Sequence, residues 1–414
     1  MVHQTINSRI ASAPKASSTI KAMRRHLLRD ILRTGLALAA AALLLACGTP
    51  RVAPPEAPEP SVLPAPVVRE PPSLPGDDAP LPPPMLRGVS RWVPVRWAQL
   101  PGLGQDGLHE AWNAWLKSCE RPAAVQGALC GDMRAQLMAD DAGRLAWLMS
   151  RFTPYRVESL DGNAAGLLTA YYEPLLEAAR APSAAFSVPL YQSPASLTRR
   201  RPWYSRQELE TLPAAQAELR GREIAYLSDP VQALVLHIQG SGRLMITEPD
   251  GSRRLVRLAF AGTNEQPYKS VGRWLLDQGL TRDASWPGIS AWIRANPGRV
   301  QELLWSNPRY VFFREEALAP GGLAEGPRGA QGVALTAGRS IAVDPQSIPY
   351  GTPVWLASSG PAANLARLVL AQDTGSAITG AVRADYYAGS GAEAGELAGR
   401  LKQPLNLWVL WPKP

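Results

Sequence analysis

Cysteine and histidine are scarce in this chain of 414 residues, which has three cysteines and four histidines. After Cys47 the only histidines are His109 and His237, and the only thiols are those of Cys119 and Cys130. A zinc site needs three or four such ligands, and a catalytic cysteine needs a nearby base. We therefore predict no metal, no cofactor and no catalytic thiol. The sequence leaves open whether Cys119 and Cys130 form a short disulfide or stay a free buried pair.

The net positive charge is also small once the N-terminal residues are set aside. The whole chain carries a formal charge of +8, but residues 1–46 hold seven basic residues against one acid. The other 36 basic and 34 acidic residues leave a net charge of only +2. A nearly neutral protein gives no electrostatic case for binding nucleic acid, so we predict no nucleic-acid partner.

Only one long apolar run occurs, and it lies near the N-terminus. Residues 36–46 are almost purely Leu and Ala, a length typical of a signal peptide and too short to span a bilayer. We predict a signal peptide over residues 1–46, with Met23 as an alternative start. No transmembrane span is expected after it.

The signal peptide ends in Leu44-Leu45-Ala46-Cys47, which resembles the bacterial lipobox whose cysteine is acylated. We predict that Cys47 is lipidated and that two acyl chains hold the protein on one leaflet. Gly48 after the cysteine favours delivery to the outer membrane, at the periplasmic face in a Gram-negative bacterium. An ordinary cleaved signal with a chance cysteine is the alternative.

Proline dominates the stretch that follows, with 14 prolines in residues 50–84. Such a composition cannot bury a core, so we predict an extended linker over residues 47–88, beginning at the lipidated cysteine. At roughly 3 Å per residue it reaches about 100 Å. A passive linker without a tuned reach fits the same composition.

Helical and β patterns divide the rest of the chain. Helical spacing predicts helices over residues 106–118, 132–152, 271–278 and 289–294. Short apolar runs bounded by Gly, Pro and Asn predict strands. The predicted strands cover residues 167–172, 233–238, 310–313, 340–343, 354–356, 368–371 and 407–410. We predict a mainly β protein with a helical N-terminal cap.

Three aspartates, Asp344, Asp373 and Asp385, stand at or beside the ends of apolar β runs in the C-terminal part. Gly375 and Gly380 could turn the chain between the last two, and a hairpin there would bring the two carboxylates together. A single aspartate after a strand is commonly a turn former. Three in one small β module favour a functional role.

Residues 373–376, Asp-Thr-Gly-Ser, also match the signature of aspartic proteases, in which two aspartates share one proton. Such enzymes need a second copy of the motif. The chain after Cys47 has none, so a protease would have to be a dimer.

Four further motifs accompany the three aspartates, at residues 168–174, 239–242, 268–272 and 307–313. In their types and order they resemble the membrane-bound lytic murein transglycosylase A family, over roughly residues 152–411. The resemblance implies a double-psi β-barrel with a second, inserted β domain and a groove between them. The implied domains are 89–178 (helical region and first barrel strand), 179–312 (inserted β domain) and 313–414 (barrel module with the three aspartates).

The resemblance also implies an activity. The family cleaves the MurNAc-β-1,4-GlcNAc bond of peptidoglycan and forms 1,6-anhydro-MurNAc, so glycan strands are the implied partner and wall-synthesis proteins are candidate partners. The catalytic acid, later the base, falls on Asp385, with Asp373 and Asp344 in support. A non-catalytic lipoprotein that only grips peptidoglycan is the alternative from another class.

Substrate contacts are implied for two further segments. The resemblance places Tyr171, Tyr172 and Glu173 against the glycan. The second segment could form the groove wall or could be a plain β-turn, and it consists of Gln239, Gly240, Ser241 and Gly242.

An acid at Asp385 must keep its proton near neutral pH, although an ordinary aspartate has a pKa of about 3.9. Burial and a neighbouring Asp373 carboxylate would raise the pKa. Arg383 lies on the same face of an extended strand and would lower it. We therefore predict that Arg383 points to substrate or to another acid. An ion pair between Arg383 and Asp385 would instead move the acid role to Asp373.

Overall fold

The structure is a computed structural model that describes residues 77–78, 80–122, 127–318 and 325–414. The predicted signal peptide, Cys47 and most of the predicted linker lie outside the described residues. Within the described residues, no helix is both long enough and apolar enough to cross a membrane.

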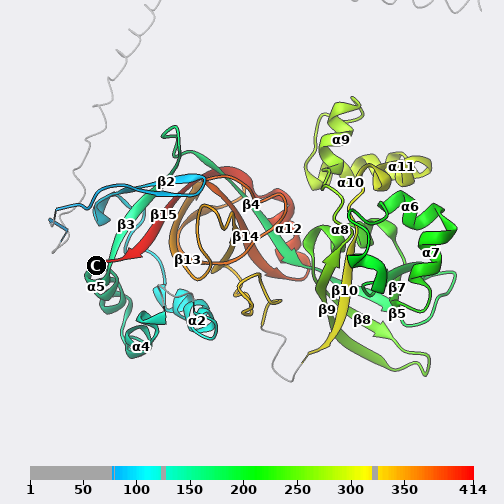
Figure 1. Cartoon of the computed structure of the whole chain (residues 1–414), viewed down its shortest axis with the longest axis horizontal. Helices are drawn as coiled ribbons and strands as arrows, with labels where there is room; N and C mark the ends of the chain where they lie inside the picture. The colour runs from blue at the N-terminus through cyan, green and yellow to red at the C-terminus, as the bar shows by residue number, and fades with distance from the viewer. Residues whose placement is uncertain (1–76, 79, 123–126, 319–324) are drawn as a thin grey trace, which may run out of the picture. The chain divides into compact units, whose positions relative to one another are not determined.

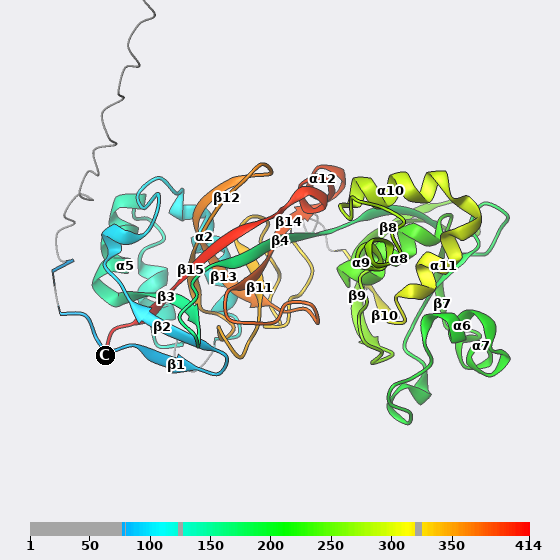
Figure 2. The same cartoon turned by 90° about the horizontal axis from the view of Figure 1, so that it is seen from above.

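The first sheet has nine strands in the order β1-β2-β3-β15-β12-β13-β11-β14-β4. It nearly closes into a barrel because β15 pairs with β4 along its first residues and with β12 and β3 further on. Figure 2 shows β4 and β15 side by side. The strands are β1 Met85–Arg87, β2 Ser90–Pro94, β3 Phe152–Ser159, β4 Gly166–Glu173, β11 Ser340–Val343, β12 Pro353–Ser359, β13 Asn364–Asp373, β14 Arg383–Ser390 and β15 Lys402–Pro412.

Alternation along the strands fills the barrel. Leu168 on β4 and Ala384 and Tyr386 on β14 belong to one buried apolar cluster, so the residues between them face outward. The two strands approach closely at Gly166, where a Cβ would lie 1.9 Å from the carbonyl oxygen of Val382. Only glycine therefore fits at the start of β4.

The helices α2 Leu108–Ser118, α4 Leu129–Ala135 and α5 Asp141–Arg151 precede β3, together with the short 3-10 helix η1 Trp97–Gln99. Their tryptophans Trp112, Trp115 and Trp147 share a buried cluster with side chains of β12, β13 and β15. The predicted helix over 106–118 is confirmed as α2.

The prediction of one helix over 132–152 is wrong. Helix α4 ends at Ala135, and α5 starts only after Asp140, whose carboxylate accepts a hydrogen bond of 2.7 Å from Gly143 N. Asp140 is thus an N-cap that begins a second helix. Phe152 is fully buried and opens β3.

The second sheet has six strands in the order β10-β9-β8-β5-β7-β6. In Figure 1, α9, α10 and α11 gather near one end of β10, and α6 and α7 lie beside β7. The strands are β5 Leu175–Ala179, β6 Val188–Tyr191, β7 Glu223–Leu227, β8 Gly242–Thr247, β9 Arg253–Thr263 and β10 Val311–Ala317. The helices are η2 Ala195–Thr198, α6 Arg206–Thr211, α7 Pro213–Leu219, α8 Pro230–Gln239, α9 Val271–Asp277, α10 Trp286–Ala295, η3 Pro297–Arg299 and α11 Val300–Ser306, and α12 Ala392–Arg400 lies between β14 and β15.

The predicted strand over 233–238 is wrong, because these residues lie in helix α8. Asp229 caps the helix by accepting from Val231 N, and Pro230 occupies the first turn. Gly240 ends it with φ of 80°, the left-handed conformation that glycine adopts at helix ends. The other predicted strands and the predicted helices at 271–278 and 289–294 all fall on observed elements of the same type.

The two β domains agree with the family resemblance. The chain passes from the first sheet to the second at Pro174 and leaves the second sheet after Ala317. The predicted domain boundaries after residues 178 and 312 stay predictions. The double-psi topology of the barrel stays a prediction.

A buried ion cluster joins the two sheets at Glu173, the last residue of β4. Its side chain is fully buried and pairs with Arg243 of β8 at 2.7 Å and Arg257 of β9 at 2.5 Å. Ser390 Oγ, at the end of β14, donates to the same carboxylate at 2.9 Å. Buried charges persist only where such partners compensate for lost hydration.

We expect Glu173→Gln to lower the free energy of unfolding by about 3–5 kcal/mol, because it leaves two buried guanidinium groups without their anion. Urea denaturation measures the change. Glu177→Gln is the matched control, since Glu177 pairs with Arg253 on the surface with 65% of its side chain exposed; it should cost less than about 1 kcal/mol. Equal losses in the two variants would contradict a special role for the buried cluster.

Candidate active site

The outward face of β4 carries three polar side chains at alternate positions, Thr169, Tyr171 and Glu173. Each contacts a different acidic or basic partner. Thr169 Oγ1 is hydrogen-bonded to Asp385, and Tyr171 OH donates to Asp373 Oδ2 at 2.8 Å. This one strand therefore positions both candidate catalytic carboxyl groups.

Asp373 and Asp385 are brought together by β11, which lies between β13 and β14. Ala342 of β11 is the register partner of both aspartates. The predicted hairpin is wrong, because the two strands do not pair with each other among the described strands. The prediction that the two carboxyl groups lie close is nevertheless met.

A register shift directs Asp373 to this face. Ile341 pairs with Ala371, but the next residue, Ala342, pairs with Asp373, so Gln372 is passed over. Such a bulge changes which side of the sheet the following side chain faces. Without it, regular alternation would turn Asp373 to the same side as the core residue Ala371.

Burial raises the pKa of both carboxyl groups above the ordinary value for aspartate. The negative charge of Asp385 raises the pKa of Asp373 further, while hydrogen bonds from Thr374, Tyr171 and Ala330 oppose the rise. For Asp385 the hydrogen bond with Thr169 and the positive charge of Arg383 oppose the rise. Two such groups share their protons as a coupled pair.

The hydrogen bonds favour a proton on Asp385. Asp373 accepts from Ala330 N at 2.9 Å and from Tyr171 OH, and an N–H can only donate. The described partner of the Asp385 carboxyl is the Thr169 hydroxyl, which can also accept. Protonating Asp385 therefore breaks no fixed donor contact, whereas protonating Asp373 competes with one.

Among the described residues Arg383 contacts no other acid, and its predicted contact with substrate stays a prediction. Its Nη2 donates to Thr169 Oγ1 at 2.8 Å, and its other guanidinium contacts are backbone carbonyl groups. No ion pair between Arg383 and Asp385 occurs in the described part of the chain. Arg383 thus acts on Asp385 through Thr169, and the acid role need not move to Asp373.

Asp344, two residues after Ala342, holds a loop. Its carboxylate accepts from Gln346 N at 2.9 Å and from Gly380 N at 2.7 Å. The second bond ties down the segment between β13 and β14, which begins directly after Asp373. The structure thus gives Asp344 a role in shaping the chain around the site.

Helix α2 supports the same segment from behind. Gln372 is fully buried, and its side-chain amide donates to Ala114 O and Ser118 Oγ at 2.8 Å each. Gln331 side-chain Nε2 donates to Arg121 O at 3.1 Å, next to Ala330, whose N–H reaches Asp373. Cys119 and Cys130 form a disulfide at this end of α2, which settles the question that the sequence left open.

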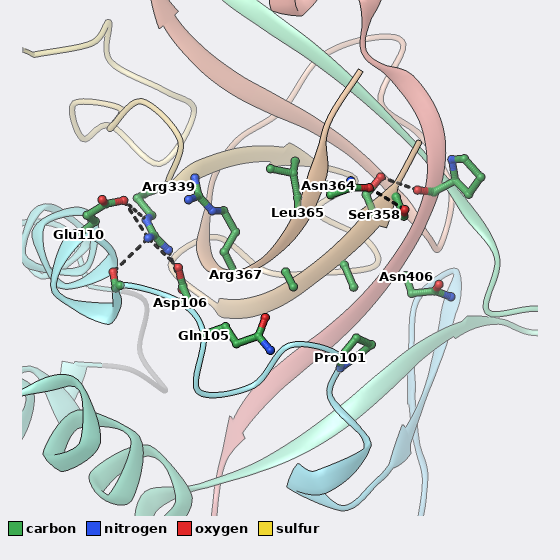
Figure 3. Close-up of a pocket in the computed structure, with 15 residues that line it drawn as sticks. Pro101, Gln105, Asp106, Glu110, Arg339, Ser358, Asn364, Leu365, Arg367 and Asn406 are labelled. Atoms are coloured by element: carbon green, nitrogen blue, oxygen red, sulfur yellow. Dashed lines mark hydrogen bonds and ion pairs between the residues drawn. The ribbon is translucent and has the colours of Figure 1, made fainter. Parts of the chain in front are cut away.

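The other end of α2 is fastened by an ion triad, shown in Figure 3. Arg339, just before β11, is buried and pairs with Asp106 at 2.7 Å and Glu110 at 2.8 Å. The hollow beside the triad measures about 790 Å³, but none of the three aspartates lines it. We therefore do not take this hollow as the catalytic site.

A cavity of about 610 Å³ adjoins the carboxyl pair. Thr169, the partner of Asp385, lines it, as do Tyr172 and Gln239. Tyr268 also lines the cavity. Burial is the main cause that raises the pKa of Tyr268, and the charge of Asp385 raises it further. The cavity is therefore the candidate for the predicted groove beside Asp385.

The predicted substrate residues fall into two groups. Tyr172 and Gln239 face the cavity, where Gln239 Oε1 accepts from Tyr172 N at 2.9 Å. Glu173 does not face it: the fully buried side chain in the ion cluster cannot contact a glycan, so its predicted role is corrected to a structural one. Tyr171 contacts Asp373, and the residues Gly240, Ser241 and Gly242 form the turn from α8 into β8.

Sequence reasoning did not single out three cavity residues, Thr169, Tyr268 and Trp286. Thr169 could have been found from its position two residues before Tyr171, on the same face of a strand. Tyr268 lies in a motif used for the family resemblance. Trp286 carried no local signal. Within the described residues no group of three or more His, Cys, Asp and Glu side chains could hold a metal ion.

We expect Asp385→Asn to be more stable than the wild type at neutral pH, by a margin that grows with pH. A carboxyl whose folded pKa is raised stabilises the fold below its unfolded pKa of about 3.9 and loses this contribution as pH rises. Urea midpoints from pH 3 to pH 7 measure the margin. Asp161→Asn should show the opposite trend, because hydrogen bonds lower the pKa of Asp161. A margin that does not change with pH would contradict a raised pKa at Asp385.

Comparisons with known proteins agree with this architecture. Residues 167–314 match the MltA specific insert domain, and residues 339–411 match the 3D domain. The membrane-bound lytic murein transglycosylase A of Vibrio cholerae serotype O1 is 30% identical over 313 residues, which cover 73% of this chain and 75% of that protein.

Two solved structures are similar over most of their length. The lytic transglycosylase LtgG of Burkholderia pseudomallei is 41% identical, with a TM-score of 0.55, over 81% of this chain and 98% of that one. MltA of E. coli with bound chitohexaose is 26% identical, with a TM-score of 0.63, over 78% of this chain and 95% of that one. With the family model domains and the relative from Vibrio cholerae, these matches show that this chain belongs to the membrane-bound lytic murein transglycosylase A family.

Proposed function

We propose that this enzyme, a peptidoglycan lytic transglycosylase, cleaves the MurNAc-β-1,4-GlcNAc bond with Asp385 as general acid and then as base. The observation that carries the proposal is the arrangement of two half-buried carboxyl groups on either side of Ala342. Asp373 is held by fixed donors, whereas Asp385 is held by a hydroxyl that can accept as well as donate. One group is thus suited to stay ionised and the other to carry the proton.

The reaction needs one proton transfer in each direction. Asp385 gives its proton to the glycosidic oxygen, and the bond between that oxygen and C1 of MurNAc breaks. The C6 hydroxyl of the same MurNAc then bonds to C1 and returns its proton to the Asp385 carboxylate. The products are a 1,6-anhydro-MurNAc end and a GlcNAc with a free 4-hydroxyl, and no water is consumed.

The intramolecular nucleophile explains why one acid suffices. Because the attacking hydroxyl belongs to the sugar itself, its effective concentration is high and no second carboxylate is needed to activate water. An ionised Asp373 near the reacting carbon stabilises the positive charge that develops on the sugar ring. Tyr171 and Ala330 N–H keep it in place. Asp344 supports the loop after Asp373 through Gly380.

The glycan would lie along the cavity beside Thr169, with Tyr172 and Gln239 on its wall. The similarity of this chain to E. coli MltA, whose structure holds bound chitohexaose, supports this placement. A lipid on Cys47 would hold the enzyme at the periplasmic face of the outer membrane, within reach of the wall, where proteins of wall synthesis are candidate partners. The family name "membrane-bound" agrees with such an anchor.

We expect the full-length protein in mild detergent to release muropeptides with 1,6-anhydro-MurNAc ends from purified peptidoglycan. In Asp385→Asn the rate should fall by about 10²–10⁴, the typical contribution of a general acid. Mass spectrometry identifies the products, and Asp277→Asn, which removes an exposed carboxylate on α9, is the control. Reducing-end sugars would mean a hydrolase, cut peptide stems a protease, and untouched peptidoglycan a binding lipoprotein.

We expect Cys47→Ala to move the protein from the outer-membrane fraction to the soluble periplasmic fraction, because two acyl chains supply the anchor. Fractionation followed by immunoblotting measures this distribution. Cleavage of isolated peptidoglycan should be unchanged, because Cys47 lies before the folded domains. A variant that stays in the outer membrane would rule out lipidation of Cys47 as the anchor.

A further inference from the structure

Three cationic side chains, Arg282, Arg400 and Lys402, line the cavity beside the carboxyl pair. They come from two parts of the chain: Arg282 from the segment between α9 and α10, and Arg400 and Lys402 from the junction of α12 and β15. All three are exposed, and none makes an ion pair within the described residues. We call these three side chains the cationic wall.

Other groups in the cavity do not neutralise the cationic wall. Among the described residues, the only acid that lines the cavity is Asp283, whose carboxylate accepts from Ser285 N at 2.8 Å and offsets one of the three positive charges. The first turn of α10, a helix of ten residues, also opens onto the cavity and adds the positive end of a helix dipole. Glu396 lies beside Arg400 in a neighbouring hollow but forms no ion pair with it. The cavity is thus cationic overall.

A neutral glycan gives no reason for such a wall. The sugar rings and N-acetyl groups of peptidoglycan carry no charge, and they call for hydroxyl, amide and aromatic partners. Carboxylates occur only on the lactyl group of MurNAc, where no peptide is attached, and on the peptide stems. Unpaired exposed cations attract such groups and speed their encounter with the site.

We propose that the cationic wall, Arg282, Arg400 and Lys402, binds carboxylate groups carried by the glycan strand and makes the enzyme prefer strands that bear them. This inference rests on the proposed function for the identity of the substrate. Lys402 is the register partner of Thr169, whose hydroxyl is hydrogen-bonded to Asp385. The bound carboxylate therefore belongs to a sugar near the bond that is cut.

Binding separates this proposal from the chemistry. In the full-length Asp385→Asn protein, strands stay uncut, and affinities can be compared for three ligands by calorimetry. The ligands are peptide-bearing glycan oligomers, the same oligomers with their peptides removed by an amidase, which leaves the lactyl carboxylates, and neutral chitohexaose. The added changes Arg282→Gln, Arg400→Gln and Lys402→Gln remove the cationic wall.

We expect the triple change to weaken binding of carboxylate-bearing oligomers by about tenfold at low salt, from three solvated contacts of modest strength. The loss should shrink at high salt because exposed charges are screened. Binding of chitohexaose should stay within about twofold. If only the peptide-bearing oligomer binds more weakly, the cationic wall binds carboxylates of the peptide stems. If only the stripped oligomer binds more weakly, the cationic wall binds the lactyl carboxylates.

A matched control tests for a mere effect of net charge. Arg134→Gln, Arg220→Gln and Arg294→Gln together remove the same charge from exposed side chains that do not line the cavity. The proposal is overturned if the control variant loses as much affinity for the charged oligomers as the triple variant does. It is also overturned if the triple variant loses as much affinity for chitohexaose as for the charged oligomers, or loses affinity for none of the three ligands. Failure to find 1,6-anhydro products would overturn the proposed reaction but leave this comparison intact.

Discussion

The alternation of side chains along β4 is the constraint on which the rest of the structure depends. One face of this strand packs into the barrel, and the other presents Thr169 to Asp385, Tyr171 to Asp373 and Glu173 to the two buried arginines. The same eight residues thus close the barrel, hold the carboxyl pair and join the second sheet. A shift of one residue in the register of β4 would turn all three contacts inward, so the strand is fixed on both faces.

Two half-buried carboxyl groups this close repel each other when both are ionised, and their hydrogen-bond partners differ in how readily each group can carry a proton. Asp373 meets an N–H and a phenol, and the loop that supplies the N–H is held by Gln331 against helix α2. Asp385 meets a hydroxyl that Arg383 orients. Helix α2 is in turn fastened by Arg339 at one end and lies against Gln372 at the other. The helices before β3 therefore contribute to the electrostatics of a site that contains none of their residues.

The two β domains followed from the family resemblance. Most strands could be predicted from the sequence, because alternation and turn residues are local signals, and the closeness of Asp373 and Asp385 could be predicted too, although through a hairpin that does not form. The route by which the aspartates meet could not. It depends on β11 inserting between their strands and on a register shift at Gln372, and neither leaves a local trace. The family resemblance placed Glu173 against the substrate, and no local signal corrected it, because its partners Arg243 and Arg257 lie far along the chain. Helix α8 was missed for a different reason: its apolar run outweighed the Asp-Pro start and the Gly end in our reading.

The distance along the chain between the contacting groups bears on when the enzyme can act. Thr169 and Asp385 are 216 residues apart in sequence, Tyr171 and Asp373 are 202 apart, and the barrel closes only when β15, at the very C-terminus, pairs with β4. A chain that ends before Asp373 contains Thr169 and Tyr171 but neither of the carboxyl groups that they contact. Under the proposed mechanism, a polypeptide whose last strands are still in the secretion channel, or one cut between the two groups and separated, is therefore harmless to the wall.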